Sequence, residues 1–465
     1  MHLTDRLKKL NPRLAAILIA AAFLYGWNIW QAGSANSYYT AAIISMTKSW
    51  HNFWYASFDP AGFITVDKPP VALWFMAISA RIFGIHGWSI VLPSVLFGIA
   101  SVYLLYLMVR PYFGQRAAEI SALVLTLTPI AAANARTNNM DTTLLFFLLV
   151  AGYILQKAVS KRKLMLVLVS FAVIGISFNI KMLQAFMVLP AMYVFYWVSS
   201  NNTWKKKLRD LGLATIVLAV FTLIWPLSVD LTNPSKRPYV GSSSSNSVLE
   251  LAFSYNGAQR LLGQSTGIGG RFSGMGNRQK SKASKAKTPP AGNGKQGKKA
   301  PGGQPNMKAA APKGNGQQNG GNNPFNVGKA GPFRVFQKEL GGQISWLLAF
   351  AITSLTAVWT ALNEQLKKWT RLDEKRRQLL YWSLWLIPTA GFFSVAGFFH
   401  PYYTVMMAPP IAALSGIGFA HMISLKGQNS KLKALYSIGL LITTMLQAWY
   451  VSEYSVILAV LLAFC

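Results

Sequence analysis

The segment FDPAGFITVDKPP, residues 58–70, places two carboxylates and an ammonium among prolines and apolar side chains. A carboxylate such as Asp59 or Asp67 can take a proton from an acceptor hydroxyl. A cation such as Lys68 can neutralise the charge that develops on a leaving phosphate. These residue types fit a reaction in which a group leaves a phosphate for a hydroxyl.

Three further segments carry side chains of the same kinds. Arg136 precedes Asp141 in ANARTNNMD, Lys181 follows an apolar run in ISFNIKMLQAF, and His400 opens HPYY. Ionisable groups beside membrane helices are functional candidates by default, and these segments would form one mixed-charge cluster if they met on the same membrane face. The prediction depends on this convergence and not on a single residue.

Structural explanations stay open for the same residues. Asp67 with Lys68, and Arg136 with Asp141, could be local ion pairs without a catalytic role. The remaining polar and aromatic side chains could simply lie at the membrane–water interface, where such residues are common. They are Lys181, His400, Tyr38, Tyr39, Tyr402 and Tyr403.

Membrane helices are the elements that would have to position these residues. The chain of 465 residues is 52% hydrophobic and 12% charged, and its apolar runs are long enough to cross a hydrocarbon core of roughly 30 Å. We expect an all-α polytopic membrane protein with about 11–13 transmembrane helices. The predicted spans are 13–30, 87–109, 117–133, 141–156, 164–180, 183–199, 211–229, 343–361, 378–397, 402–424 and 433–451, with a fragment at 453–465.

The distribution of Lys and Arg orients these spans. With the N-terminus in the cytoplasm, the loops on that side hold 23 Lys and Arg residues and the opposite short loops hold 5, as the positive-inside rule expects. All the candidate residues then fall on the extracytoplasmic side. A shorter apolar stretch at 70–84, opened by Pro69-Pro70, is predicted to be a juxtamembrane helix on that side.

The remaining 17 basic residues lie in a long outer loop, 231–342, so the formal charge of +32 does not indicate nucleic acid binding. Its middle, about 273–331, is rich in Gly, Asn, Gln and Lys, and we expect it to be disordered. This segment is either a cationic arm for anionic polymers or lipids, or a solvated insertion. The predicted organisation is a membrane catalytic module at 1–230, this loop, and C-terminal helices at 343–465, whose ending within an apparent span is typical of a truncated chain.

Metal and nucleotide chemistry find little support in the sequence. Cys465 is the only cysteine and the five histidines are widely separated, so no Cys-rich or His-rich zinc site is indicated. The membrane location suggests that the phosphate belongs to a lipid, and no Gly-rich phosphate loop that would indicate a nucleotide donor occurs. No cofactor is predicted with certainty, and a divalent cation stays an open alternative.

The motifs VDKPPVALWFMAISARIFG, ARTNNMDTTLLFF and NIKMLQAFMVLP resemble, in this order, the bacterial branch of glycosyltransferase family 39. That branch is related to protein O-mannosyltransferases and lipid A aminoarabinose transferases. The resemblance covers roughly residues 13–230, with a weaker echo in FFHPYYTVMMAPPIAAL. It implies the GT-C fold, an active site on the extracytoplasmic face, a polyprenyl-phosphate sugar as donor, and inversion at the anomeric carbon.

The resemblance also assigns roles to single positions. Asp67 and Lys68 match an acidic residue followed by a phosphate-binding lysine. Arg136 and Asp141 match the second outer loop, and Lys181 matches a lysine at the entrance to a later helix.

The first outer loop departs from the family pattern. Many relatives carry an acidic residue or pair where this chain has Ala35 and Asn36, and an amide cannot act as a base. The catalytic carboxylate is therefore predicted among Asp67, Asp59 and Asp141, with Asp67 favoured because it adjoins the phosphate-binding candidate. The predicted substrate-binding residues are Lys68, Arg136, Lys181, His400, Asn36, Tyr39 and Tyr402.

The leading hypothesis is a multi-pass cell-membrane glycosyltransferase that moves a mannose-like hexose from a polyprenyl phosphate to an extracytoplasmic glycan, lipid or protein. A lipid-linked sugar flippase or transporter is the alternative, although no inverted repeat is evident and the charges gather at helix ends. A third hypothesis, a cationic wall-binding scaffold, uses only the loop at 231–342. No nucleic acid partner is expected.

Overall fold

The computed structural model describes residues 11–31, 35–258, 260, 325–365, 372–425, 430–455 and 458. Within these ranges the chain forms helices and no β-strand. Most of the segment predicted to be disordered, 273–331, lies outside the described residues, as does most of the C-terminal fragment at 453–465. Where the description resumes at Phe325, the chain is packed, and Val327 is fully buried.

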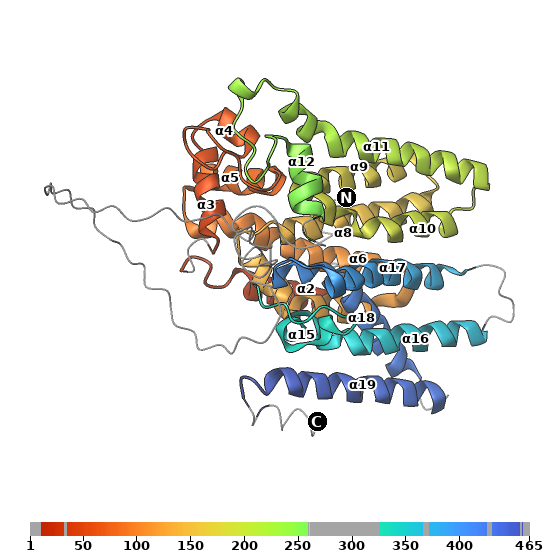
Figure 1. Ribbon diagram of the computed structural model, residues 1–465. Helices are drawn as coiled ribbons and strands as arrows, with labels where there is room; N and C mark the ends of the chain where they lie inside the picture. The colour runs from red at the N-terminus through yellow and green to blue at the C-terminus, as the bar shows by residue number, and fades with distance from the viewer. Residues whose placement is uncertain are drawn as a thin grey trace, which may run out of the picture.

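Long apolar helices lie side by side and form the body of the molecule (Figure 1). Seven helical stretches of the described chain are long and apolar enough to cross a membrane. The body consists of α2 (Pro12–Gly26), α6 (Gly87–Leu127), α8 (Asp141–Lys161), α9 (Leu164–Lys181), α10 (Leu189–Ser199), α11 (Trp204–Asp230), α16 (Leu348–Gln365), α17 (Glu374–Val395), α18 (Ala408–Ser424) and α19 (Ser430–Val451).

Two of the stretches change direction within their length. Gly114 has a φ of +85° inside α6, and Met182 has a φ of +48° where α9 meets the 3-10 helix η1 (Met182–Val188). Positive φ values interrupt a right-handed helix, so each stretch contains two limbs. The hydropathy pattern predicts these limbs as separate spans. Each predicted span up to 433–451 overlaps helical structure, although 117–133, 183–199, 343–361 and 402–424 each cross from one helical element to the next.

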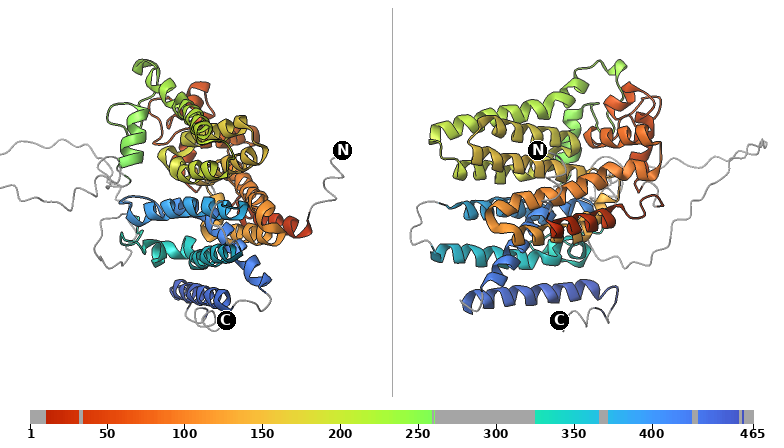
Figure 2. Two further views of the ribbon diagram at one scale, coloured as in Figure 1. Left: turned by 90° about the vertical axis from the view of Figure 1, so that its right-hand side faces the viewer. Right: turned by 180° about the vertical axis from the view of Figure 1, so that it is seen from behind.

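The helices pack around one large hydrophobic core. α6 packs most extensively against α18, and α9 lies against both α8 and α11. Trp382, Trp385 and Phe393 of α17 are completely buried in this core. Figure 2 shows from two further sides that α11 and α19 lie at opposite edges of the bundle.

Shorter elements gather at one end of the bundle, the left-hand end in Figure 1, which is called the site end below. The stretch predicted as a juxtamembrane helix at 70–84 is α5 (Val71–Phe83), and Pro70 is its N-cap residue. The other short elements are α3 (Ser37–Met46), α4 (Trp50–Tyr55), α7 (Pro129–Ala135), η2 (Pro234–Lys236), α12 (Val248–Phe253), the π-helix η3 (Ser254–Ala258), η4 (Arg334–Phe336), α15 (Lys338–Ile344), η5 (Ser345–Leu347) and η6 (Pro401–Met407).

Backbone hydrogen bonds fix the loop before α5. The Thr65 N–H donates to the Tyr239 carbonyl at 2.8 Å, and the Tyr239 N–H donates to the Phe63 carbonyl at 2.8 Å. Below this contact, Trp225 of α11 and Val248 of α12 belong to a second, smaller hydrophobic cluster. The loop that carries the first charged motif is thereby held in place before α5 begins.

Candidate active site

Two lysine–carboxylate pairs lie at the site end. Lys68 Nζ is 2.5 Å from Asp67 Oδ2 and 3.2 Å from the Asp67 carbonyl oxygen. Lys181 Nζ is 2.5 Å from Asp141 Oδ1. Both lysines and Asp141 are buried. Because removing charges from water is costly, buried ion pairs of this kind contribute little to stability. Stability alone therefore does not explain why these pairs are buried here.

The backbone and side chain of Asp67 are held by several neighbours. Its N–H donates to the Tyr38 hydroxyl at 3.2 Å, and its carbonyl accepts from Asn256 Nδ2 at 3.1 Å. Burial alone would raise the pKa of Asp67, but the positive charges of Lys68 and Arg260 outweigh burial and lower it. Asp67 is therefore ionised, and its Oδ1 has no hydrogen-bond partner among the described residues.

Helix ends bring the second pair together. Asp141 is the first residue of α8 and Lys181 is the last residue of α9, so each charge complements the dipole of its helix. The next residue, Met182, has a positive φ, a strain that is often found at functional sites. Lys181 Nζ also lies 3.4 Å from the centroid of the Tyr403 ring, a cation–π contact. Asp141 Oδ2 has no partner within the described chain.

Arg260 supplies a third buried cation that the sequence analysis missed. Its guanidinium lies 4.6 Å from the Phe398 ring centroid, 5.0 Å from that of Tyr255 and 5.7 Å from that of Tyr403. Its Nη1 is buried and has no hydrogen-bond partner among the residues described. The sequence around it, NGAQRLLG, belongs to the long outer loop and carries no motif that would have distinguished this arginine.

A pocket of about 270 Å³ opens between the three cations. Gln184 Nε2 and Arg260 Nη1 both belong to residues that line it, and both are buried donors without a partner in the described chain. Because buried polar groups are normally hydrogen-bonded, a ligand that presents oxygen acceptors would complete this pocket. The full lining is Lys68, Lys181, Leu183, Gln184, Met187, Asn256, Gly257, Ala258, Arg260, Phe392, Phe399 and Tyr403.

His400 and Tyr402 contribute aromatic rings beside the pairs. Their rings are stacked with centroids 5.0 Å apart, and Tyr402 lies 5.3 Å from the Lys181 ammonium. Burial, followed by the nearby charges of Arg260 and Lys181, lowers the pKa of His400 to about 3. His400 is therefore neutral at physiological pH and adds no positive charge to the site.

Asn36 belongs to the scaffold around the site. Its Oδ1 accepts backbone N–H groups at the start of α3, and its Nδ2 donates to Asn139 Oδ1 at 3.2 Å. Its own N–H donates to Asn138 Oδ1 at 2.8 Å. Asn36 thus ties the first outer loop to the loop before α8. Tyr39 is buried close to Asp67. Burial, followed by the negative charge of Asp67, raises the pKa of the Tyr39 hydroxyl.

Arg136 lies apart from the pocket. Its Nη1 donates to the carbonyl of Leu24 in α2 at 2.8 Å. The carboxylate that the sequence offered as its partner, Asp141, is paired with Lys181 instead. Arg136 therefore connects α2 to the loop before α8.

Asp59 also lies apart from the pocket. Its carboxylate accepts the backbone N–H groups of Phe63, at 2.9 Å, and Ile64, at 3.0 Å, within its own turn. Burial raises its pKa, but the backbone hydrogen bonds together outweigh burial and lower the pKa below its ordinary value. Of the residues predicted for the site, the structure brings together Asp67, Lys68, Asp141, Lys181, His400, Tyr39 and Tyr402.

No group of three or more His, Cys, Asp or Glu side chains that could hold a metal ion occurs in the part of the chain that the structure describes. The divalent cation stays the open alternative that the sequence left.

Comparison with known proteins links this arrangement to a family. The family model described as dolichyl-phosphate-mannose-protein mannosyltransferase matches residues 67–225, a range that begins at Asp67 and includes Asp141, Lys181 and Gln184. The chain is also 46% identical to the "Putative mannosyltransferase YycA" of Bacillus subtilis (strain 168) over an alignment of 478 residues that covers 96% of this chain and 69% of that protein.

Solved structures support the same fold. The crystal structure of ArnT from Cupriavidus metallidurans in the apo state matches with a TM-score of 0.54 at 17% identity, covering 95% of this chain and 65% of ArnT. The structure of that ArnT bound to undecaprenyl phosphate matches with a TM-score of 0.55 at 15% identity, covering 99% and 75%. The chain thus spans about two thirds to three quarters of its solved neighbours, and the likeness confirms the predicted all-α, polytopic GT-C-type fold.

Proposed function

This chain belongs to the glycosyltransferase family described as dolichyl-phosphate-mannose-protein mannosyltransferase, and we propose that it transfers a mannose-like hexose from a polyprenyl phosphate to an acceptor hydroxyl outside the cytoplasm. The observation that carries the proposal is the site-end pocket, where three buried cations meet buried donors that have no partner within the described chain. A phosphate offers several oxygen acceptors and negative charge, and charge-assisted hydrogen bonds to it are among the strongest in proteins.

The phosphate of the donor is proposed to lie between Lys68 and Arg260. Both line the pocket, and both lie near the Tyr255 ring, at 5.3 Å and 5.0 Å from its centroid. The apolar part of the lining suits a polyprenyl chain; it includes Leu183, Met187, Phe392 and Phe399. A solved neighbour of the same fold, ArnT, has been crystallised with undecaprenyl phosphate, which supports a lipid-phosphate ligand.

The proposed reaction is a displacement at the anomeric carbon. The acceptor hydroxyl oxygen forms a bond to this carbon, the bond from the carbon to the phosphate oxygen breaks, and its electron pair stays on the phosphate. The hydroxyl proton passes to a carboxylate of the site. Lys68 and Arg260 stabilise the negative charge that collects on the departing phosphate, a contribution that grows as the bond breaks.

Asp67 is the favoured proton acceptor. Its Oδ1 has no partner among the residues that the structure describes, its side chain is 15% exposed, and it lies beside the proposed phosphate ligand Lys68. Asp141 is 1% exposed and is held by Lys181, which suits a residue that positions the acceptor. Asp59 is a weaker candidate because its carboxylate closes its own turn.

The charge pattern supports an active site on the extracytoplasmic face. The loops at the end opposite the site hold most of the short-loop Lys and Arg residues, and such loops remain in the cytoplasm. We therefore propose a cell-membrane protein whose donor enters from the outer leaflet. The acceptor is an envelope glycan, lipid or protein.

Transfer by the purified full-length protein in liposomes tests this function. The donor is a synthetic polyprenyl-phosphate mannose with a labelled sugar, and the acceptor is an envelope fraction from cells that lack the protein. Lys68→Ala and Arg260→Ala should each lower kcat/KM by roughly 10- to 100-fold, since a hydrogen bond to a charged group contributes about 1.5–3 kcal/mol.

The matched control is Lys48→Ala, which removes an exposed lysine from the same end of the molecule. It should transfer sugar at the rate of the unaltered protein. Equal activity in all variants would overturn the phosphate-binding role. Movement of the labelled lipid across the bilayer without formation of a glycosidic bond would instead favour the flippase alternative.

A further inference from the structure

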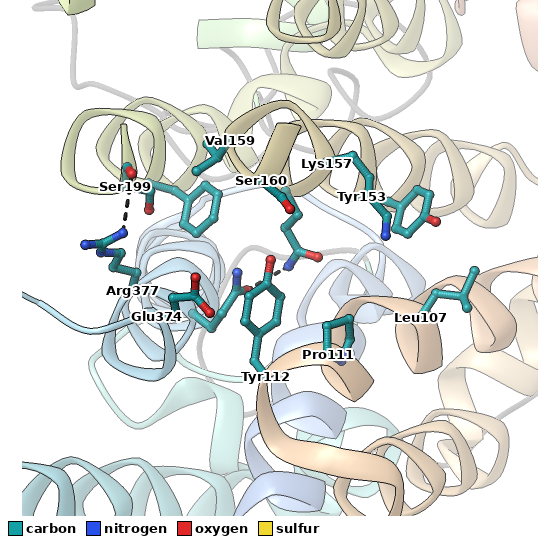
Figure 3. A pocket seen from close by; sticks show the side chains of 13 residues that line it. Leu107, Pro111, Tyr112, Tyr153, Lys157, Val159, Ser160, Ser199, Glu374 and Arg377 are labelled. Carbon is teal, nitrogen blue, oxygen red and sulfur yellow. Dashed lines mark hydrogen bonds between the residues drawn. The ribbon is translucent and has the colours of Figure 1, made fainter. Parts of the chain in front are cut away.

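A second polar pocket lies at the end of the bundle opposite the site end (Figure 3). It has a volume of about 180 Å³ and lies between α6, α8, α10 and α17. No residue of the proposed active site lines it. Its polar lining includes Tyr112, Gln156, Lys157, Glu374, Arg377 and Gln378.

A buried amide pair lies at the side of this pocket. Gln156 Nε2 donates to Gln378 Oε1 at 2.7 Å, and both residues are nearly completely buried. The Tyr112 hydroxyl lies within hydrogen-bonding reach of the Gln378 side chain. Polar side chains therefore line a space between membrane helices that apolar packing could have closed.

The cations of the pocket keep bonding capacity for a ligand. Arg377 donates from Nε to the Leu372 carbonyl at 2.7 Å and from Nη1 to the Ser199 carbonyl at 3.3 Å, so its Nη2 has no bond within the described chain. Lys157 forms no ion pair among the described residues. Figure 3 shows these two cations on opposite sides of the pocket, with the acidic group of Glu374 on the same side as Arg377.

Two further pockets adjoin the loop at 199–202. One has a volume of about 180 Å³ and the other of about 450 Å³, and Arg377 lines the larger one as well. Together the three pockets are lined by the cations Lys157, Arg162, Lys163, Lys206, Lys207 and Arg377, against the acids Glu374 and Asp210. Asp210 is already neutralised, because its carboxylate accepts from Tyr196, Asn202 and Arg209.

We propose that the pockets around the loop at 199–202 bind the phosphate headgroup of an anionic membrane phospholipid. Basic pockets between membrane helices are suited to such headgroups. The positive-inside rule alone would explain Lys and Arg residues on cytoplasmic loops, wherever their side chains point. It does not explain why these cations line pockets at and between the ends of the helices. Trp197 and Trp204 are 41% and 62% exposed near the same loop, as expected for side chains at the membrane surface. A lipid is favoured over a soluble phosphate because the first pocket lies between membrane helices and the other two adjoin the ends of such helices.

Native mass spectrometry of the full-length protein in detergent tests the proposal. The probes are phosphatidylglycerol, phosphatidylcholine and inorganic phosphate. Lys157→Gln/Arg377→Gln should weaken phosphatidylglycerol binding by roughly 10- to 30-fold, since each Lys or Arg near a membrane surface contributes about 1 kcal/mol to the attraction of anionic lipid. Phosphatidylcholine should bind weakly to every variant, and millimolar inorganic phosphate should not displace the anionic lipid.

The matched control is Lys431→Gln/Lys433→Gln, which removes the same charge from exposed residues at the start of α19, outside the pockets. It should bind phosphatidylglycerol as the unaltered protein does. Arg377→Lys keeps the charge, and its affinity for phosphatidylglycerol should stay within about threefold of that of the unaltered protein. This variant provides the test if the double variant does not fold. Equal losses in the pocket and control variants, equal binding of the two lipids, or displacement by inorganic phosphate would overturn the proposal.

Discussion

Asp67 and Asp141 each use one carboxylate oxygen for a lysine and leave the other without a partner in the described chain. This shared pattern hides a difference in surroundings. Asp67 lies in a loop beside Lys68 and Arg260, whereas Asp141 lies at the start of a membrane helix. Both residues are carboxylates, but their surroundings favour different roles: Asp67 is the candidate base, and Asp141 is the candidate positioning residue.

Asp67→Asn tests the proton acceptor. The amide keeps the shape of the side chain but cannot take a proton, so kcat should fall by roughly 10²- to 10⁴-fold. The affinity for the donor should change much less, because Lys68 and Arg260 remain. Steady-state transfer and donor binding measured on the same preparation separate the two quantities. A variant that retains kcat would remove Asp67 from the proposed role.

The lowered pKa of His400 predicts that the stability of the protein depends on pH. Its pKa is about 3 in the folded protein and about 6.5 when unfolded, so the unfolded chain binds more protons between these values. The stabilisation is complete above pH 6.5 and is lost as the pH falls toward 3. Between pH 7.5 and pH 5 the loss should be on the order of 2 kcal/mol.

Thermal unfolding of the protein and of His400→Gln at both pH values measures this effect. The variant should lose less stability on acidification than the unaltered protein. Asp67 does not confuse the comparison, because its lowered pKa keeps it ionised at pH 5. Identical pH dependence in the two proteins would show that His400 is not held neutral.

At the scale of elements, helix ends determine where charge collects. The hydropathy pattern predicts the ends of α8 and α9, and therefore predicts that Asp141 and Lys181 lie at helix termini on the same side. It does not predict that they pair. The spacing in ANARTNNMD favours Arg136 as the partner of Asp141, but the packing of α8 against α9 places Lys181 there. Tertiary contacts decide between cations that sequence spacing leaves equivalent.

Substitutions in this inter-helix pair separate stability from activity. Asp141→Asn leaves Lys181 as a buried charge without its partner and should lower stability by about 3–5 kcal/mol. Asp141→Leu/Lys181→Met removes both charges and should regain much of that stability while remaining inactive. Thermal unfolding together with the transfer assay gives the answer. An active double variant would mean that the pair is structural only.

At the scale of the whole molecule, the site is assembled from segments that are far apart in the chain. Charge type and hydropathy identify most of them, because each is a polar interruption at the end of an apolar run. Arg260 escapes this reasoning because it stands among many basic and polar residues of a long loop, where only the folded contacts with Tyr255, Phe398 and Tyr403 distinguish it. The opposite error occurs at Asn36, Asp59 and Arg136. Their residue types would suit an active site, but in the structure they stabilise turns and contacts between helices and loops.

Cysteine labelling tests the proposed orientation in cells. In a Cys465→Ser background, Phe63→Cys places a thiol at a position that is 75% exposed at the site end, and Lys206→Cys places one on an exposed residue at the opposite end. A membrane-impermeant maleimide should label the first variant in intact cells and the second only after permeabilisation. The reverse pattern would place the site in the cytoplasm.

The central claim is that the site-end pocket holds a polyprenyl phosphate. A cryo-electron microscopy structure of the full-length protein with a synthetic polyprenyl-phosphate hexose tests it most directly. We predict phosphate oxygens about 2.7–3.0 Å from Lys68 Nζ and the Arg260 guanidinium, with the lipid chain along the apolar part of the pocket lining. A ligand bound elsewhere, with this pocket still empty, would contradict the account.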